Sequence, residues 1–317
     1  MSEQRSLSIH PELAPLVDSV SKVILGKTKH ILYIISAWIA NGHVLIEDVP
    51  GTGKTVLVKS LSKSLDLKFG RIQLTPDLLP SDIIGMTLYN EAKREFYFSK
   101  GPVFCDLLLA DELNRATPRT QSALLEAMAE KQITVDAQTL PLSNLFCVIA
   151  TQNPIEQHGT FPLPEAQLDR FMIRISLGLP DPKSEYQMLI DRVSQDPLEK
   201  IKMVAKADLL LTLRAQLAHV KTSQSIYEYI LAIISKARSH PDVELPPSPR
   251  ATLALAKIAQ AYTLVMGQDY VRPTFVYELI PYVLAHRMTI GAEAKFTGKT
   301  CHTVLDEIIK SVRVPTK

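Results

Sequence analysis

The stretch HVLIEDVPGTGKTVLVKSLSKSL, residues 43–65, decides the fold. Its first six residues form a short, mostly apolar run that predicts a buried strand. Its second half has apolar residues at 57, 58, 61 and 65, which fall on one face of a helix. A glycine-rich turn between strand and helix is the setting of a phosphate-binding loop, because the free amides and the dipole of the helix start attract an anion. The stretch therefore predicts a nucleotide site in an α/β fold.

The spacing of the glycines marks the same turn. The chain has 12 glycines in 317 residues, and only Gly51 and Gly53 are separated by a single residue. The string GKT occurs at 26–28, 53–55 and 298–300, but only the middle copy contains a member of this pair. Asp48 stands where the pattern GxxxxGK[ST] has its first glycine, which weakens the match. A glycine-rich turn with an exposed lysine remains the alternative interpretation.

The predicted phosphate loop supplies a cation and a hydroxyl group. Lys54 would neutralise the β- and γ-phosphates of a nucleotide, and the Thr55 hydroxyl would ligate Mg²⁺. The predicted cofactor-binding residues of the loop are Asp48, Val49, Pro50, Gly51, Thr52, Gly53, Lys54, Thr55 and Val56.

Two adjacent acids follow a second apolar run. Residues 105–110 predict a strand that ends in Asp111 and Glu112. Neighbouring carboxylates at a strand end are costly without a cation. With Mg²⁺ on the Thr55 side, Asp111 would hold the metal through water, and Glu112 would orient and polarise the attacking water. A solvated acidic strand end is the alternative.

A third predicted strand, 145–150, runs into the sequence TQNP at 151–154. Asn153 would then lie level with Glu112 and the γ-phosphate, where a neutral amide positions water without adding charge. An Asn-Pro pair that only initiates a turn is the alternative.

Composition limits the classes of protein that remain. With 46% hydrophobic and 21% charged residues the chain is globular, and 35 Lys/Arg against 33 Asp/Glu leave a net charge of +2, which favours neither a nucleic-acid nor a membrane-surface partner. Cys105, Cys147 and Cys301 are widely spaced, so we expect buried thiols and neither disulfides nor a zinc site. The chain start lacks the apolar core of a signal peptide, and the longest apolar run, 31–40, is about half of a membrane span. We expect a cytoplasmic protein.

Several long strings go beyond these local signals. They are LIEDVPGTGKT at 45–55, RIQLTPDLLPSDIIG at 71–85, GPVF at 101–104, LLLADELNRATPRTQSALLEAMAE at 107–130, VIATQNPIEQHGTFPLPEAQLDRF at 148–171 and SPRA at 248–251. Through these strings the chain resembles the MoxR family of AAA+ ATPases over nearly its whole length. The resemblance implies a P-loop core with a parallel five-stranded sheet and inserted β-hairpins, followed by an all-helical lid.

The resemblance also implies roles for individual residues. Gly51, Gly53, Lys54 and Thr55 correspond to Walker A, Asp111 and Glu112 to Walker B, and Asn153 to sensor 1. The cofactors would be ATP and Mg²⁺. Arg170 corresponds to the arginine finger that such rings insert into the neighbouring subunit's ATP site, where a guanidinium stabilises the transferring phosphoryl group.

Arg250, in SPRA, corresponds to sensor 2 and could report the γ-phosphate to the lid. The family more often has Gly-Ala before SPR, whereas this chain has Pro246 and Pro247, which would stiffen the approach to Arg250. Upstream, Val23 and Ile24 fit the family's adenine-contacting segment.

Two insertions resemble hairpins that line the central pore of related machines. One pairs 87–90 with 95–98 and is expected to interrupt the second core helix; the other spans 131–144. The aromatic residues Tyr89, Phe96, Tyr97 and Phe98 could grip a substrate, although a plain hairpin core is an equal alternative for Phe96 and Phe98.

The alternation of apolar runs predicts two domains. Strands near 43–48, 69–75, 107–111, 145–151 and 171–177 predict an α/β nucleotide-binding core at 1–180, and the sequence LPDP at 179–182 marks a junction. Helical spacing, as in Ile226, Ile230, Ile233 and Ile234 and in Leu253, Leu255, Ile258 and Ala261, predicts an all-helical lid at 181–317.

Four other residues have no assigned chemistry. We expect Trp38 in the core and His286 with Arg287 in a surface or interhelical contact. Arg115 could reach a phosphate across a subunit boundary or pair with a nearby acid, and both remain open.

The leading functional hypothesis is an ATP-hydrolysing ring, a homo-hexamer, that remodels or activates a client protein. The resemblance suggests clients with a von Willebrand factor A-type domain, or maturation of metal-containing enzymes. The alternative is a nucleic-acid motor of the helicase type, which the small net charge disfavours. A transcriptional activator is disfavoured because AKFTGK, the string closest to the GAFTGA loop it needs, lies at 294–299, outside the expected region. A scaffold without turnover is disfavoured by the presence of Lys54, Asp111, Glu112 and Arg170.

Overall fold

The computed structural model describes residues 8–136, 138–155, 159–194 and 197–315, with 191–194 described only as backbone. Its centre is a five-stranded parallel sheet in the order β2-β5-β8-β1-β9. The strands are β1 (Val44–Glu47), β2 (Phe69–Gln73), β5 (Leu107–Asp111), β8 (Cys147–Gln152) and β9 (Ile173–Ile175). All five predicted strands are therefore confirmed, with ends that differ by a few residues.

Each face of the sheet is covered by a different apolar cluster. Val44, Ile46 and Leu109 point into a cluster with helices α1 (Ala14–Ser21), α2 (Thr28–Ile39) and α3 (Lys54–Leu65). Leu45 and Leu108 point into a second cluster with α5 (Pro118–Glu130). The alternation arises because successive side chains of a strand point to opposite faces. The helix that follows the glycine-rich turn buries its predicted face, at 57, 58, 61 and 65.

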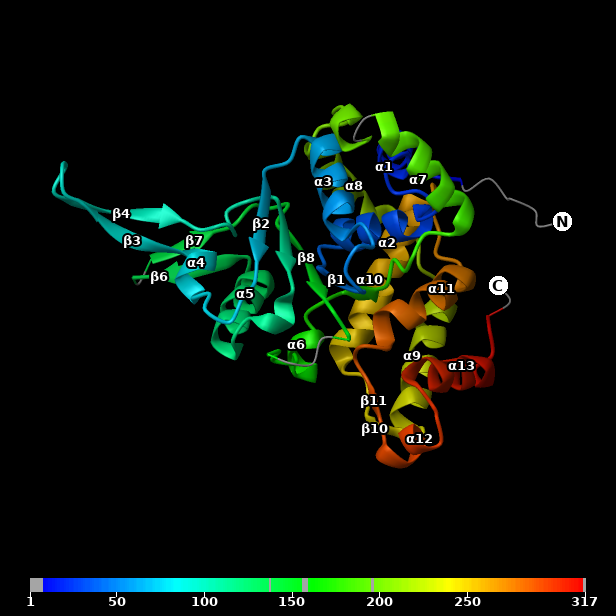
Figure 1. The fold of residues 1–317 in the computed structure, drawn as a ribbon. Helices are drawn as coiled ribbons and strands as arrows, with labels where there is room; N and C mark the ends of the chain where they lie inside the picture. Colours follow the sequence, from blue (N-terminus) through cyan, green and yellow to red (C-terminus); the bar gives the residue numbers. More distant parts are fainter. Residues whose placement is uncertain (1–7, 137, 156–158, 195–196, 316–317) are drawn as a thin grey trace.

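Both predicted hairpins are present. β3 (Gly85–Asn90) pairs antiparallel with β4 (Glu95–Lys100), and β6 (Gln132–Val135) pairs antiparallel with β7 (Gln138–Pro141). The β3–β4 hairpin extends far from the rest of the molecule (Figure 1). It follows the short helix α4 (Pro80–Ile84) but does not interrupt a longer one, because the chain enters β5 without resuming a helix. At its base the backbones of Gly85 and Gly101 approach too closely for any Cβ atom.

The rest of the chain is mainly helical. Its helices are α6 (Glu165–Leu168), α7 (Pro182–Ser194), α8 (Asp208–Gln216), α9 (Gln224–Ser239), α10 (Pro249–Val265), α11 (Pro273–Leu284), α12 (Ala292–Phe296) and α13 (Cys301–Ser311), with short 3₁₀ turns at Leu113–Arg115, Pro197–Lys200 and Leu217–His219.

The expectation of an all-helical lid was wrong in one detail. β10 (Val243–Leu245) and β11 (Thr289–Ile290) form a small antiparallel sheet, because the extended segments that lead into α10 and α12 lie side by side and exchange backbone hydrogen bonds. The predicted face of α9 is buried at all four isoleucines. On α10 the prediction fails at Leu253, which is 62% exposed, while Leu255, Ile258 and Ala261 are buried.

The C-terminal helices pack directly on the core. One apolar cluster runs from α2 into α10 and α11, and Trp38 is buried as expected, with its Nε1 donating to Leu145 O at 2.7 Å. Tyr33 on α2 donates its hydroxyl to Glu278 Oε1 on α11 at 2.7 Å. The predicted boundary at 180/181 falls between β9 and α7; the division into two domains stays a prediction.

The cysteines and the GKT string at 298–300 have structural roles outside the nucleotide site. Cys105 and Cys147 are buried thiols, as expected, and burial raises the pKa of each to about 12; Cys301 is half-buried. The GKT string at 298–300 makes structural contacts within the lid: Lys299 pairs with Asp242 at 2.6 Å, and Thr300 caps α13. Among the described helices, none combines the length and the apolar character that a bilayer crossing requires.

Candidate nucleotide site

The phosphate loop joins the carboxyl end of β1 to the start of α3. Gly51 and Gly53 both have a φ of +87°, a left-handed backbone that glycine adopts without strain. Lys54 Nζ donates to the carbonyl oxygens of Asp48 and Val49 at 2.7 and 3.1 Å. A phosphate could replace these carbonyls as partners of the ammonium group. Burial lowers the pKa of Lys54, an effect that nearby carboxylates oppose.

Asp48 has a structural role that its sequence position did not suggest. Its carboxylate is buried and accepts hydrogen bonds from Ser176 Oγ at 2.9 Å, Leu177 N at 2.5 Å and Gly178 N at 3.2 Å. These donors follow β9, so the side chain ties the start of the phosphate loop to the segment that leads out of the sheet. The prediction that Asp48 binds the nucleotide therefore has no support from its carboxylate, whose oxygens already have these three donors.

Asp111 lies at the end of β5, on the sheet face that carries α3. The carboxylate is buried and receives Arg71 Nε at 2.9 Å and Thr151 Oγ1 at 3.3 Å. Arg71 comes from β2 and Thr151 from β8, so both strands that flank β5 help to orient Asp111. The Asp111 carboxylate and the Thr55 hydroxyl are oxygen donors of the kind that Mg²⁺ prefers, so the residues fit the predicted metal.

Glu112 has a left-handed backbone, with a φ of +58°, which turns the chain sharply after β5. Its amide donates to Thr151 Oγ1 at 2.9 Å, which holds the turn. Arg115 Nε lies 3.2 Å from Glu112 Oε2. Of the two roles left open for Arg115, an ion pair with a nearby acid is the one observed within the chain.

Asn153 follows β8, which lies between β5 and β1 in the sheet. It is thus flanked by the acids on one side and the phosphate loop on the other, as predicted. Its Oδ1 accepts the amide of Ile155 at 3.2 Å, so the side chain also takes part in the turn that was considered as the alternative. The turn is observed, and the role of the amide in positioning water stays a prediction.

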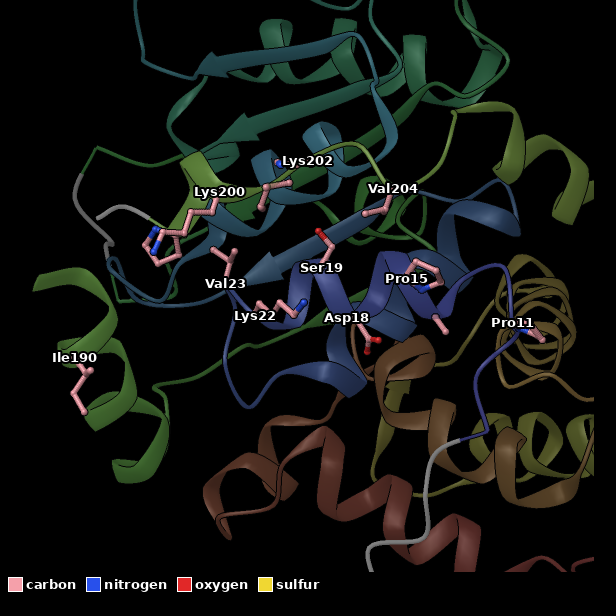
Figure 2. Close-up of a pocket in the computed structure, with 13 residues that line it drawn as sticks. Pro11, Pro15, Asp18, Ser19, Lys22, Val23, Ile190, Lys200, Lys202 and Val204 are labelled. Atoms are coloured by element: carbon pink, nitrogen blue, oxygen red, sulfur yellow. The ribbon is translucent and has the colours of Figure 1, made fainter. Parts of the chain in front are cut away.

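The segment predicted to contact adenine lies against the phosphate loop. Ile24 is buried, and its Cδ1 lies 3.8 Å from the position of a Cβ on Gly53. Val23 borders a cavity of about 780 Å³ between α1, α7 and the residues that follow 197 (Figure 2). Figure 2 shows Lys22, Lys200 and Lys202 around this cavity. The structure therefore offers room next to Val23, although the residues that line the cavity do not include those of the phosphate loop.

Arg170 and Arg250 lie together, but at the opposite edge of the sheet. Both line a cavity of about 480 Å³ with Gly42 and His43. These two residues precede β1, whereas the phosphate loop follows it. The amide of Met172 donates to His43 O at 2.8 Å, which holds the chain after Arg170 at this edge. Four strand residues separate the edges by about 13 Å.

The expectation that Arg250 reports the γ-phosphate to its own lid is therefore not supported by its position. The cause is packing: α10 lies against α2, and its N-cap Ser248 bonds Asp169 of the core at 2.9 Å, which holds the helix start beside Arg170. Pro247 is buried, and its carbonyl accepts Arg238 Nε at 3.1 Å, so the approach to Arg250 is firmly held.

Arg71 and Thr151 complete the site but were not predicted. Arg71 stands at the start of the string RIQL, and Thr151 precedes Asn153 by two residues. Thr151 is a polar residue at the end of an apolar run, which was an available signal, whereas Arg71 stands in a strand of mixed composition, Phe69–Gln73, and had none. Their partner could be assigned only once the order of the strands was known. His286 and Arg287 are buried and bond Phe171 and Asp169 of the core, so of the two contacts expected for them the surface one is not observed and a contact between elements is.

Comparison with known proteins defines the class first. A model of the ATPase family associated with various cellular activities (AAA) matches residues 43–173, and a model of the AAA lid domain matches 235–308. The fold is accordingly that of an α/β P-loop AAA+ core with a helical lid, and the family binds nucleotide.

The relatives narrow this class. Chaperone MoxR1 of Mycobacterium tuberculosis is 36% identical over 93% of this chain and 80% of its own length. YeaC of Bacillus subtilis, an uncharacterized protein, is 45% identical over 97% and 96%. The crystal structure of a protein assigned as an ATPase from Cytophaga hutchinsonii superposes with a TM-score of 0.89 at 37% identity, covering 96% of this chain and 95% of that one. The chain belongs to the MoxR family of AAA+ ATPases.

Proposed function

We propose that this protein hydrolyses ATP as a homo-hexameric ring, in which Arg170 and Arg250 of one subunit complete the Mg·ATP site of the next. The observation that carries the proposal is the separation of the two arginines from the phosphate loop of their own chain. A side chain at the far edge of the sheet cannot serve its own γ-phosphate across about 13 Å. It can serve a neighbour whose phosphate loop faces the cavity.

The cavity that holds the two arginines suits a triphosphate. Lys131, Lys257 and Arg287 line it as well, so five basic residues line the cavity against two acids, Glu130 and Asp169. Leu253, one turn along α10 from Arg250, is 62% exposed at the same place. A large exposed leucine beside the exposed Arg250 and Lys257 is the composition of a surface that meets another protein. This combination supports a subunit contact at the cavity.

Within one subunit the residues divide the chemistry. Lys54 and the amides of the phosphate loop bind the phosphates, and Thr55 and Asp111 hold Mg²⁺. When bound, Mg²⁺ would neutralise part of the charge of the phosphates. Glu112 orients and polarises water once Arg115 releases it, and Asn153 keeps that water in place. Arg170 and Arg250 of the neighbour stabilise charge on the transferring group.

A hybrid ring tests the contribution in trans. Arg170→Ala subunits should bind ATP and fail to turn it over, and Lys54→Ala subunits should fail to bind it. Mixing the two should restore part of the activity, because each supplies what the other lacks. The trans assignment is overturned if the mixture stays inactive while each variant assembles normally, or if a monomeric form keeps full activity.

We further propose that the ring acts on a client protein. One relative carries the name Chaperone MoxR1, which supports chaperone-like work here. On the β3–β4 hairpin, Tyr89 and Phe96 form an exposed pair with ring centroids 5.1 Å apart, and Phe96 is 74% exposed; Phe98 instead packs against Phe104. We infer that Tyr89 and Phe96, together with Tyr97, contact the client. A von Willebrand factor A-type domain remains the proposed client class and the cytoplasm the proposed location.

The client can be captured on the ATP-bound state. Glu112→Gln subunits in ATP should retain a protein that the same subunits with Tyr89→Ser and Phe96→Ser do not. Basal ATP turnover of the hairpin variant in the wild-type background measures whether the ring itself is intact. Salt-dependent binding of DNA with stimulated turnover would instead favour the nucleic-acid motor.

A further inference from the structure

Asp169, the residue before Arg170, is held by two groups from the lid. Its Oδ1 accepts Arg287 Nε at 2.7 Å, and its Oδ2 accepts the Ser248 hydroxyl at 2.9 Å. Arg287 follows α11, and Ser248 caps α10 two residues before Arg250. One carboxylate thus joins the residue before Arg170 to the residue that caps the helix of Arg250.

Arg287 is almost completely buried and is satisfied in full. Its guanidinium makes five hydrogen bonds, one to the Asp169 carboxylate and four to main-chain carbonyls. These acceptors are Asp169 O, Phe171 O, Met172 O and Val283 O, at 3.3, 2.5, 3.0 and 2.6 Å. Three of the carbonyls belong to the segment around Arg170. A buried guanidinium with a rigid fork of donors therefore fixes the path of the chain on both sides of the finger.

Resting on the proposed function, we propose that Asp169, Arg287 and Ser248 are positioning residues that hold Arg170 and Arg250 in one fixed relation for the neighbour's ATP. Asp169 and Arg287 also line the cavity, but their charged groups are already bonded to each other, so neither is assigned to the nucleotide. They act through the two arginines, which would otherwise stand on separate parts of the chain joined by loops.

Separating Asp169 from Arg287 would be energetically costly, so we expect this ion pair to stay intact. Removing the carboxylate leaves the buried charge of Arg287 without its anion, which is unfavourable in a low-dielectric environment. Because both carboxylate oxygens are used, the lid cannot move away from the Arg170 segment without breaking a charged hydrogen bond. The two arginines therefore move together, and a change in the position of the lid is transmitted to the neighbour's site.

The experiment replaces Asp169 by Asn and follows ATP binding and turnover separately. Asp169→Asn should bind a fluorescent ATP analogue with wild-type affinity and lose on the order of 10- to 100-fold in kcat, because a displaced catalytic group costs rates of this size. Mixing with Lys54→Ala subunits should restore activity, since those subunits carry correctly placed arginines. Glu165→Gln, an exposed carboxylate on α6, is the matched control and should leave kcat within about twofold of wild type.

A mutant cycle distinguishes a positioning role of Asp169 from a general effect on stability. In a chain that carries Arg170→Ala and Arg250→Ala, adding Asp169→Asn should change the residual kcat by less than about twofold, because nothing remains to be positioned. Ser248→Ala should reproduce part of the kcat loss and Ser248→Thr should restore it, which keeps the test available if Asp169→Asn does not fold.

The inference is overturned if Asp169→Asn keeps wild-type kcat, if its loss persists in the chain lacking both arginines, or if Lys54→Ala subunits fail to restore it. Wild-type turnover in Arg170→Ala would instead remove the proposed function. The two failures are distinguishable, because loss of turnover in Arg170→Ala with full turnover in Asp169→Asn overturns the positioning role alone.

Discussion

Arg71 Nε lies 2.9 Å from Asp111 Oδ2, so the carboxylate assigned to the metal already has a cationic partner. The Arg71 side chain is 47% exposed, which limits the strength of the pair through solvent screening. The guanidinium and Mg²⁺ would compete for the same carboxylate.

Arg71→Gln should therefore lower the Mg²⁺ concentration that gives half-maximal ATP turnover. We expect a decrease of about two- to fivefold, because a half-exposed ion pair contributes about 0.4 to 1 kcal/mol. A magnesium titration at saturating ATP measures it. An increase would mean that the orientation of Asp111 by Arg71 outweighs the competition with Mg²⁺.

Lys54→Ala and Glu112→Gln should separate binding from chemistry. Lys54→Ala removes the ammonium that faces the phosphates and should abolish ATP binding, whereas Glu112→Gln should bind ATP and stop at that stage. Equilibrium binding of an ATP analogue and phosphate release measure the two steps. Hydrolysis that survives in Glu112→Gln would remove the assignment of this residue as the base.

Asp48→Gly, which restores the common glycine of the loop pattern, should destabilise the protein. The substitution leaves Ser176, Leu177 and Gly178 without the buried carboxylate that accepts from them. Because hydrogen bonds to a charged group contribute about 1.5 to 3 kcal/mol, we expect a loss of about that size in urea unfolding. Asp48→Asn retains one acceptor oxygen and should lose less. An Asp48→Gly protein as stable as wild type would contradict the stabilising role of the hydrogen bonds from residues 176–178 to Asp48.

His43 predicts a specific dependence of stability on pH. Its Nδ1 accepts Val148 N at 2.9 Å and its Nε2 lies 3.0 Å from Met128 O, so the neutral ring fits this place. Burial lowers the pKa of His43 to about 4, from 6.5. A folded pKa below the unfolded one means that the unfolded chain takes up the proton first as the pH falls.

The free energy of unfolding should therefore fall by about 3 kcal/mol from this group as the pH drops from 6.5 to 4, and recover as the pH rises. His43→Gln should flatten the profile in that window, and the exposed His302→Gln should leave it unchanged. Denaturant unfolding at a series of pH values measures both. Identical profiles for wild type and His43→Gln would contradict the prediction.

The phosphate loop, Asp111, Glu112 and Asn153 could be placed from the sequence for one physical reason. Each follows directly on an apolar run, and the carboxyl ends of parallel strands meet at one edge of a sheet. The helical faces were predictable from spacing, except at Leu253, where burial was expected and an exposed position is observed.

Other features depend on contacts between distant parts of the chain. Asp48 finds its donors at 176–178, far along the sequence, so its strand-end position gave no indication of a tether. The place of Arg250 depends on the packing of α10 against α2 and on the bond from Ser248 to Asp169. Neither arises from local spacing, and the roles assigned to the site residues stay predictions until the variants are measured.

The apolar seam between α2 and α10 has a mechanical consequence. Close-packed interiors are nearly incompressible and transmit strain rather than absorb it. Tyr33 and Tyr262 lie within this seam with their rings 5.4 Å apart, so a push on the start of α10 is passed to α2. From there it reaches Ile24 and the loop beside it. In a ring, each subunit would then act as a rigid body that transmits a displacement from the neighbour's nucleotide site, at the start of α10, to its own phosphate loop.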